Sequence, residues 1–258
     1  MANGAGTGVK AGVAAGCAAM IAVGWVYASA RAPSYLLPPP AVVWDAAVNF
    51  FTSARQLGHL GATLFHIGSS ISVAFGVGAA LALLAHYVAW SAPAIRDRLT
   101  PFLNAFSGIA WTLLSVIWFG VSSTTVIFTI TVVLLPFALV NLREGLDAVD
   151  RETDEMGRSF TRSRLRAFRL LILPALVPFA AATLRIMFGV AWKVALTAEL
   201  FGGDRGLGFL VNMARQEFAT ETIFLVIIFI IVSVYLADRL VFLRFERAAA
   251  RRYGGRTA

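Results

Sequence analysis

The sequence contains a single cysteine, Cys17, and few charged residues, which make up only 14% of the 258 positions. One cysteine excludes a disulfide framework and a metal site made of cysteine thiolates. The scarcity of charge, with 59% hydrophobic residues and a mean hydropathy of +0.76, excludes an ordinary soluble domain of this length. We therefore expect the lipid bilayer to be the solvent for most of the chain.

Nucleotide-binding and catalytic motifs are also absent from the sequence. No Gly-x-x-x-x-Gly-Lys-Ser/Thr loop occurs, so we do not expect the chain itself to hydrolyse ATP. An intramembrane enzyme would need converging acids, bases or metal ligands, and the apolar segments lack such a set. His66 and His86 have no carboxylate or cysteine at metal-ligand spacing, and we assign neither of them a role. The sequence thus predicts a protein that is not an enzyme and binds no metal or cofactor.

Six apolar segments are long enough to cross a bilayer core, which takes about 20 helical residues. The third and fourth are separated only by the residues 120–123, which predicts a helical hairpin with a tight turn. We therefore expect an all-α, polytopic membrane protein with one transmembrane domain over residues 1–258. Its spans are predicted near 11–30, 64–89, 102–119, 124–142, 176–201 and 223–243.

Lys and Arg are unevenly divided between the two sides of this topology. With the N-terminus inside, the outer segments hold only Arg31, Arg55, Arg205 and Arg215. The positive-inside rule then places both termini in the cytoplasm, and the net charge of +8 reports topology, with no indication of nucleic-acid binding. An alternative exists for the first span, because Ala28-Ser29-Ala30 resembles a signal-peptide cleavage site and cleavage would leave five spans.

The predicted cytoplasmic loop, residues 143–174, has an internal order that a simple connection does not need. Its first part is acidic and its second part, from Arg158 to Arg169, is basic, which suits the dipole of a helix. Apolar residues recur through it at helical spacing, at Met156, Phe160, Ala167 and Leu171. About thirty residues of this kind indicate a protein partner on the cytoplasmic side. The alternative is a solvated charged loop that only sets the topology.

The fifth predicted span holds three charged residues, although charge inside a bilayer is costly unless it faces other helices or water. Spacings of three and four residues place Arg185, Trp192 and Glu199 on one stripe of the helix, with Lys193 on its flank. We interpret this face as part of a pathway for an anionic solute, lined by Lys193, Trp192 and Arg185. The alternative is that Arg185 pairs or snorkels near the cytoplasmic side while Glu199 reaches the outer interface.

Trp111 and Ser115 share one face of the third predicted span and are further candidates for lining the pathway. Small and aromatic residues in membrane helices also serve packing. Packing is the alternative for both residues.

The end of the long loop resembles the permease subunits of binding-protein-dependent ABC importers, within them the nitrate, sulfonate and taurine type. The family's cytoplasmic signature runs Glu-Ala-Ala, three residues, Gly, nine residues, Ile, any residue, Leu-Pro. The same spacing joins Glu155-Met156-Gly157, Thr161, Leu171 and Leu173-Pro174, with Thr161 in the place of the glycine. Further similarities follow in chain order at Leu37 to Pro40, Ile117 to Gly120, Arg185, Ala191-Trp192, Ala198 to Leu200 and Gly206 to Gly208. The third span departs from the family, because residues 109–115 lack the prolines that relatives carry before the hairpin.

The resemblance implies a type I ABC importer permease fold and a coupling helix that docks on an ATPase. The residues of that contact would be Glu155, Gly157, Phe160, Thr161, Leu171, Leu173 and Pro174. It also implies a homodimer in the bacterial inner membrane, two ATPase subunits that bind ATP and Mg²⁺, and a periplasmic or lipid-anchored solute-binding protein. The alternative is a self-contained secondary transporter or channel for a small anion. Secondary carriers usually show inverted repeats, and we find no internal repeat in the sequence.

Overall fold

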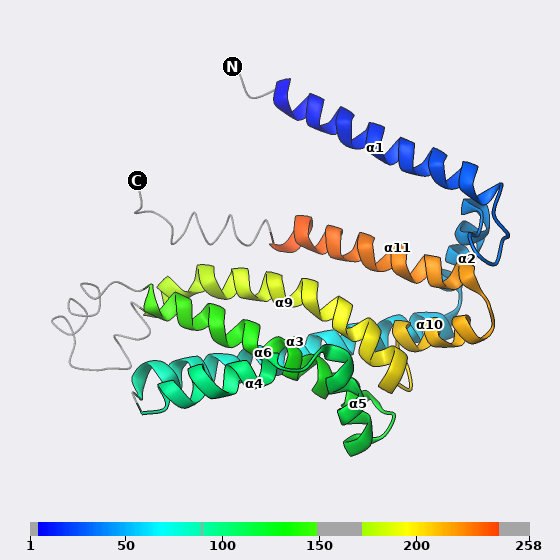
Figure 1. The fold of residues 1–258 in the computed structure, drawn as a ribbon. Helices are drawn as coiled ribbons and strands as arrows, with labels where there is room; N and C mark the ends of the chain where they lie inside the picture. Colours follow the sequence, from blue (N-terminus) through cyan, green and yellow to red (C-terminus); the bar gives the residue numbers. More distant parts are fainter. Residues whose placement is uncertain (1–4, 89, 149–171, 243–258) are drawn as a thin grey trace. The chain divides into compact units, whose positions relative to one another are not determined.

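The computed structural model describes residues 5–88, 90–148 and 172–242, and all regular elements in these ranges are helices (Figure 1). In chain order they are α1 (Ala5–Ser29), α2 (Pro40–Thr52), α3 (Ala54–Tyr87), η1 (Ala94–Leu99), α4 (Thr100–Asn104), α5 (Gly108–Phe119), α6 (Ser123–Asp147), α9 (Leu173–Gly202), α10 (Leu207–Gln216), α11 (Thr220–Ala237) and η3 (Asp238–Phe242). The all-α prediction is confirmed.

The chain divides into two compact units, which are described separately. One contains Met1–Leu57 and Val211–Ile228, and the other contains Gly58–Leu210 and Phe229–Ala258. In the first unit the indole Nε1 of Trp25 donates a hydrogen bond of 3.1 Å to the carbonyl oxygen of Pro38. The Trp25 ring also stacks on Phe224, with the ring centroids 6.1 Å apart. Trp25 therefore joins α1, the proline segment after it and the first part of α11.

Helix α6 is the centre of the second unit. Its apolar side chains at helical spacing are almost completely buried, namely Val126, Ile130, Leu134, Ala138, Leu139, Leu142 and Leu146. It packs against α4, α5 and α9. Because burial of α6 among other helices leaves little of it for lipid, this helix fixes the positions of its neighbours.

Close approach between α3 and α6 depends on a small residue. A Cβ atom placed on Gly78 would lie 2.6 Å from the Cβ of Ala138, so no larger residue fits there. Eight residues earlier on α3, the hydroxyl of Ser70 donates a hydrogen bond of 3.1 Å to the carbonyl oxygen of Ile127. Small residues and a hydroxyl thus join the two helices, as is common where lipid supplies no hydrophobic drive between helices.

Four helices of the described chain, α3, α6, α9 and the α11 segment, are long and apolar enough to span a membrane. The third predicted span differs from the prediction, because it is broken: the helices on either side of residues 105–107 are bent by 89°. Ser107 restarts the helix, since its extended backbone lets its Oγ accept a hydrogen bond of 3.3 Å from the Ala110 amide. Counted as one span, this bent pair is the fifth, and Ala19–Ser29 of α1 is a shorter apolar helix.

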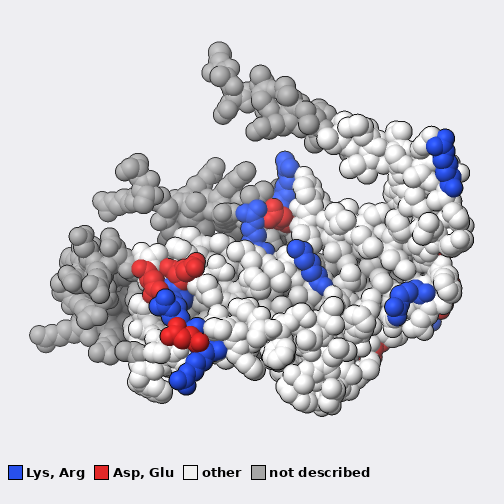
Figure 2. All heavy atoms as spheres, viewed as in Figure 1, with Lys and Arg blue, Asp and Glu red and all other residues white. Residues whose placement is uncertain are grey.

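The predicted hairpin between α5 and α6 is confirmed. Gly120 has a φ of 68°, a left-handed conformation that glycine adopts without steric cost, and it ends α5. Ser122 then caps α6 through a hydrogen bond from the Thr125 amide to its Oγ. Most of the surface seen in Figure 2 carries no charged side chain, as expected for a protein that faces lipid.

Candidate functional site

Helix α9 carries three of the charged residues that the sequence singles out, and their surroundings differ. Glu199 and the Trp192 side chain are buried, whereas Lys193 is exposed and Arg185 is partly exposed. The single polar stripe expected from the spacing is therefore split between the interior of the unit and an open face. The reason is that Met187, Ala191, Ala195 and Ala198 form the buried face of α9, and Glu199 lies at its end.

Arg185 forms a two-point ion pair with Asp238, the first residue of η3. The Arg185 Nε lies 2.6 Å from one carboxylate oxygen of Asp238, and its Nη2 lies 3.0 Å from the other. Both side chains remain more than one third exposed. The fork of a guanidinium matches a carboxylate in this geometry, so the pair fixes the end of α11 to α9.

Asp238 was missed by the sequence analysis, although Arg185 was expected to pair with some group. An acidic residue at the end of the last apolar segment was the available signal. The sequence could not identify the pair, because nothing local shows that positions 185 and 238 are neighbours.

A cavity of about 530 Å³ lies between α9 and the later part of α11 with η3. Arg185, Trp192, Lys193 and Asp238 line it, and its other walls are apolar and aromatic, at Phe188, Gly189, Ile230, Ile231, Val234, Tyr235 and Phe242. Arg185 and Lys193 are about 12 Å apart along the helix axis, from the rise per residue. The structure thus brings together three of the five residues predicted to line a pathway.

Two polar groups at this cavity have no partner within the described residues. Lys193 makes no ion pair there, and the indole Nε1–H of Trp192 is buried without an acceptor. An unpaired ammonium and an unpaired buried N–H are both costly in an apolar environment. Together they form a place where an anion would find a charge and a hydrogen-bond donor.

Trp111 and Ser115 lie elsewhere, in the interior of the α4, α5 and α6 contact. The Trp111 Nε1 donates to the carbonyl oxygen of Leu103 at 3.3 Å, and its ring packs edge-on to Phe102 and Phe106. The Ser115 hydroxyl donates to the Trp111 carbonyl oxygen and accepts a hydrogen bond from Thr129. Neither residue lines the cavity beside Lys193.

Glu199 is the centre of a buried polar cluster. One carboxylate oxygen lies 2.8 Å from Nδ1 of His66, and the other accepts hydrogen bonds of 2.9 Å from the Thr63 hydroxyl and the Gly208 amide. The Leu207 amide in turn donates to the Thr63 hydroxyl. This cluster joins α3 to the end of α9 and the start of α10, so His66, to which the sequence analysis assigned no role, contacts the buried Glu199 carboxylate.

The packing around the Glu199 carboxylate explains why positions 206 and 208, just after α9, are both glycine. Gly206 has a φ of 113°, and a Cβ atom on it would collide with the Glu199 carboxyl group. A Cβ on Gly208 would collide with the carbonyl oxygen of Leu196. The turn can therefore wrap around Glu199 only because both positions lack a side chain.

The residues predicted to contact an ATPase fall mainly outside the described chain. Glu155, Gly157, Phe160, Thr161 and Leu171 lie between residues 149 and 171. Leu173 and Pro174 are described, and they form the first turn of α9, with Leu173 exposed. Their predicted role stays a prediction. In the described part of the chain, no group of three or more His, Cys, Asp or Glu residues could hold a metal ion.

These features define a polytopic helical membrane protein with a charged groove beside α9 and a buried carboxylate that fixes the turn after it. The chain belongs to the family of binding-protein-dependent transport system inner membrane components, whose profile matches residues 19–250. It is thus an inner-membrane permease subunit of an ABC importer, and ATP hydrolysis belongs to separate subunits. The alternative of a self-contained secondary transporter or channel is set aside by this membership.

Two relatives are similar to this chain in sequence, and one solved structure is similar to it in fold. The taurine transport system permease protein TauC of Escherichia coli is 28% identical over 235 residues, covering 86% of this chain and 82% of that protein. The bicarbonate transport system permease protein CmpB of Synechococcus elongatus is 26% identical, covering 70% and 65% of the two chains. A chain of the MetNI methionine ABC transporter matches the fold with a TM-score of 0.65 at 17% identity, covering 75% of this chain and 95% of that one. The predicted type I ABC importer permease fold is confirmed.

Proposed function

We propose that this permease subunit conducts a small anionic solute along the face of α9 that holds Arg185, Trp192 and Lys193. The observation that carries the proposal is Lys193, an exposed ammonium in the middle of a 30-residue apolar helix that has no counter-ion within the described residues. Membrane helices keep an ionisable residue at such a position mainly where it meets water or a solute. The adjoining cavity has room for a small organic or inorganic anion.

The substrate class has support from two relatives. Their names give taurine and bicarbonate as the transported solutes, and both solutes carry an anionic group. Lys193 supplies a positive charge, and the Trp192 indole supplies a donor and an aromatic wall. Arg185 is paired with Asp238, which offsets its charge, so in this proposal Lys193 is the cation that meets the solute. The lining role predicted for Trp111 and Ser115 stays a prediction.

The proposed assembly has two copies of this chain, two ATPase subunits on the cytoplasmic side and a solute-binding protein outside. ATP and Mg²⁺ bind to the ATPase subunits, and this chain binds no cofactor. Both termini face the cytoplasm, which places residues 143–174 on the ATPase side. Closure of the ATPase dimer draws the two coupling segments together and turns the pathway outward, and hydrolysis resets it.

Transport by a Lys193 variant tests the anion pathway. The full chain is reconstituted in proteoliposomes with its ATPase and binding protein, and ATP-driven uptake of sulfonates, nitrate and bicarbonate is measured. Lys193→Gln removes a charged hydrogen bond to the solute, so uptake is expected to fall about tenfold or more, whereas Lys193→Arg keeps most of it.

Comparing uptake by Lys193→Gln with uptake by Lys193→Arg shows whether a positive charge at this position is needed. Equal uptake by Lys193→Gln and the unchanged protein would contradict the pathway proposal. Basal ATPase activity serves as the control for assembly, because Lys193 lies about 28 Å along α9 from Pro174, the nearest predicted coupling residue, from the rise per residue.

A further inference from the structure

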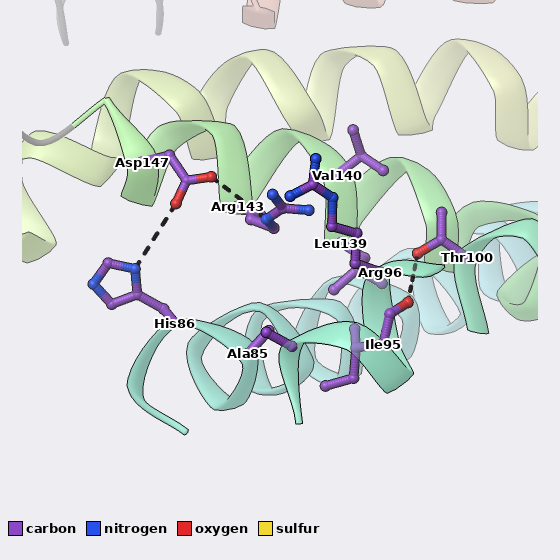
Figure 3. A pocket seen from close by; sticks show the side chains of 10 residues that line it. Ala85, His86, Ile95, Arg96, Thr100, Leu139, Val140, Arg143 and Asp147 are labelled. Carbon is purple, nitrogen blue, oxygen red and sulfur yellow. Dashed lines mark hydrogen bonds and ion pairs between the residues drawn. The ribbon is translucent and has the colours of Figure 1, made fainter. Parts of the chain in front are cut away.

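A second cavity lies at the other charged region of the second unit, between the end of α3, η1 and the end of α6. Its volume is about 340 Å³. Figure 3 shows Arg96 from η1 and Arg143 from α6 extending into this space, with His86 and Asp147 at one side. In the proposed orientation this is the cytoplasmic end of the unit.

The cations of this cavity outnumber its acids. Asp147 is the only carboxylate that lines it within the described residues, and Asp147 is shared between Arg143, 3.4 Å away, and His86, 4.0 Å away. Arg96 has Asp97 as its partner at 3.7 Å, but both side chains are about two-thirds exposed and Asp97 does not line the cavity. Such exposed pairs are weak, so the Arg96 guanidinium remains available to a ligand.

Part of the cavity wall is apolar and packed into the core of the unit. Ile95 and Leu139 line it and are almost fully buried in a cluster with Leu142 and Leu146. The rim carries the hydroxyl of Thr100, which is held by a hydrogen bond of 3.1 Å to the Ile95 carbonyl oxygen. Two guanidinium groups above an apolar wall present bidentate donors to a compact anion and hydrocarbon surface to an attached chain.

We propose that this cavity binds a phosphate group between Arg96 and Arg143. Guanidinium groups match phosphate oxygens in planar, two-point contacts, and a phosphate carries enough charge to use both. Basic pockets between membrane helices on the cytoplasmic side hold anionic lipid headgroups, and the apolar wall suits a lipid. The phosphate therefore comes from a phospholipid headgroup or from a soluble phosphate ester. The assignment to the cytoplasmic leaflet rests on the proposed orientation, whereas binding itself does not.

Binding to the purified full chain in detergent tests the proposal. Short-chain phosphatidylglycerol is titrated against phosphatidylcholine, and glycerol phosphate and inorganic phosphate are titrated separately. Phosphatidylglycerol is expected to bind in preference to phosphatidylcholine. Arg96→Gln and Arg143→Gln should each weaken binding about tenfold. Arg98→Gln is the matched control, because Arg98 is exposed on the same short helix and does not line the cavity.

One further variant distinguishes a binding site from damage to the fold. Asp147→Asn removes the carboxylate that competes for Arg143, so it is expected to tighten phosphate binding. Strong binding of glycerol phosphate would assign the site to a soluble ester, and a requirement for the acyl chains would assign it to lipid. The proposal is overturned if Arg98→Gln weakens binding as much as Arg96→Gln, if Asp147→Asn does not tighten it, or if neither phosphatidylglycerol nor glycerol phosphate binds more tightly than phosphatidylcholine. None of these results depends on transport, so they leave the Lys193 test unaffected.

Discussion

At the scale of single residues, Glu199 shows how a buried charge can be kept in a membrane helix. Its carboxylate is completely buried, with one oxygen against His66 of α3 and the other bound by Thr63 of α3 and the Gly208 amide at the start of α10. An unpaired charge there would cost several kcal/mol, but each of these contacts offsets part of that cost. Glu199 therefore holds the segment after α9 in place, while the side chain of Lys193, on the same helix, is exposed.

Glu199→Gln should destabilise the protein. The amide keeps one acceptor oxygen for the Thr63 hydroxyl and the Gly208 amide, but its uncharged NH₂ group then faces Nδ1 of His66, and the stronger hydrogen bonds to a charged carboxylate are lost. We expect a loss of about 1–3 kcal/mol in the free energy of unfolding. Thermal unfolding of the purified chain in detergent, followed by tryptophan fluorescence, measures the loss. Glu217→Gln is the control, because Glu217 is exposed. Equal melting temperatures for the two variants would contradict the claim that Glu199 stabilises the segment after α9.

The sequence singled out Arg185, Lys193 and Trp192 as candidates, but it did not show what surrounds them in the fold. Periodicity shows which residues share a face of one helix, and it gave the stripe on α9. It does not show which helix that face meets. Asp238 and His66 were missed for this reason, since each lies more than 50 residues from its partner.

At the scale of helices, the contact between α3 and α6 depends on the absence of a side chain at Gly78. Gly78→Ala should push the helices apart, because the added methyl group would overlap Ala138. A buried overlap of this size typically costs about 1–3 kcal/mol.

Gly76→Ala is a matched control two residues away on the same helix. A Cβ atom on Gly76 meets nothing within 4 Å, and alanine favours a helix over glycine. We therefore expect Gly76→Ala to be neutral or slightly stabilising and Gly78→Ala to melt at a lower temperature. Identical melting curves for the two variants would show that the close contact between α3 and α6 does not limit stability.

The sequence predicted best those helix ends that are set by the residues at the end itself. The hairpin turn at Gly120 followed from a short polar break between two apolar runs, and the structure confirms it. The break at residues 105–107 was not predicted. Hydropathy continues across it, and only the cap at Ser107, which is a matter of backbone geometry, divides the span.

At the scale of the whole molecule, composition and the order of apolar segments were enough to predict a polytopic membrane protein. The order of short motifs along the chain was enough to predict the family, which the matching of residues 19–250 confirms. Neither source identifies the solute, and the pathway residues that helical spacing predicts stay predictions, because lining a pathway depends on which helix faces meet in three dimensions. That Lys193 and the Trp192 indole have no partner among the described residues becomes visible only once the neighbours of α9 are known.

The central claim is that ATP hydrolysed by a separate subunit drives transport through this chain by way of residues 143–174. The most direct test is Phe160→Asp, measured as ATP-driven uptake and ATPase binding in proteoliposomes, with Phe160→Leu as the control. A charge on the apolar stripe should abolish docking and uptake while leaving membrane insertion intact, and the leucine variant should retain both activities. Normal uptake and ATPase binding by Phe160→Asp would contradict the account.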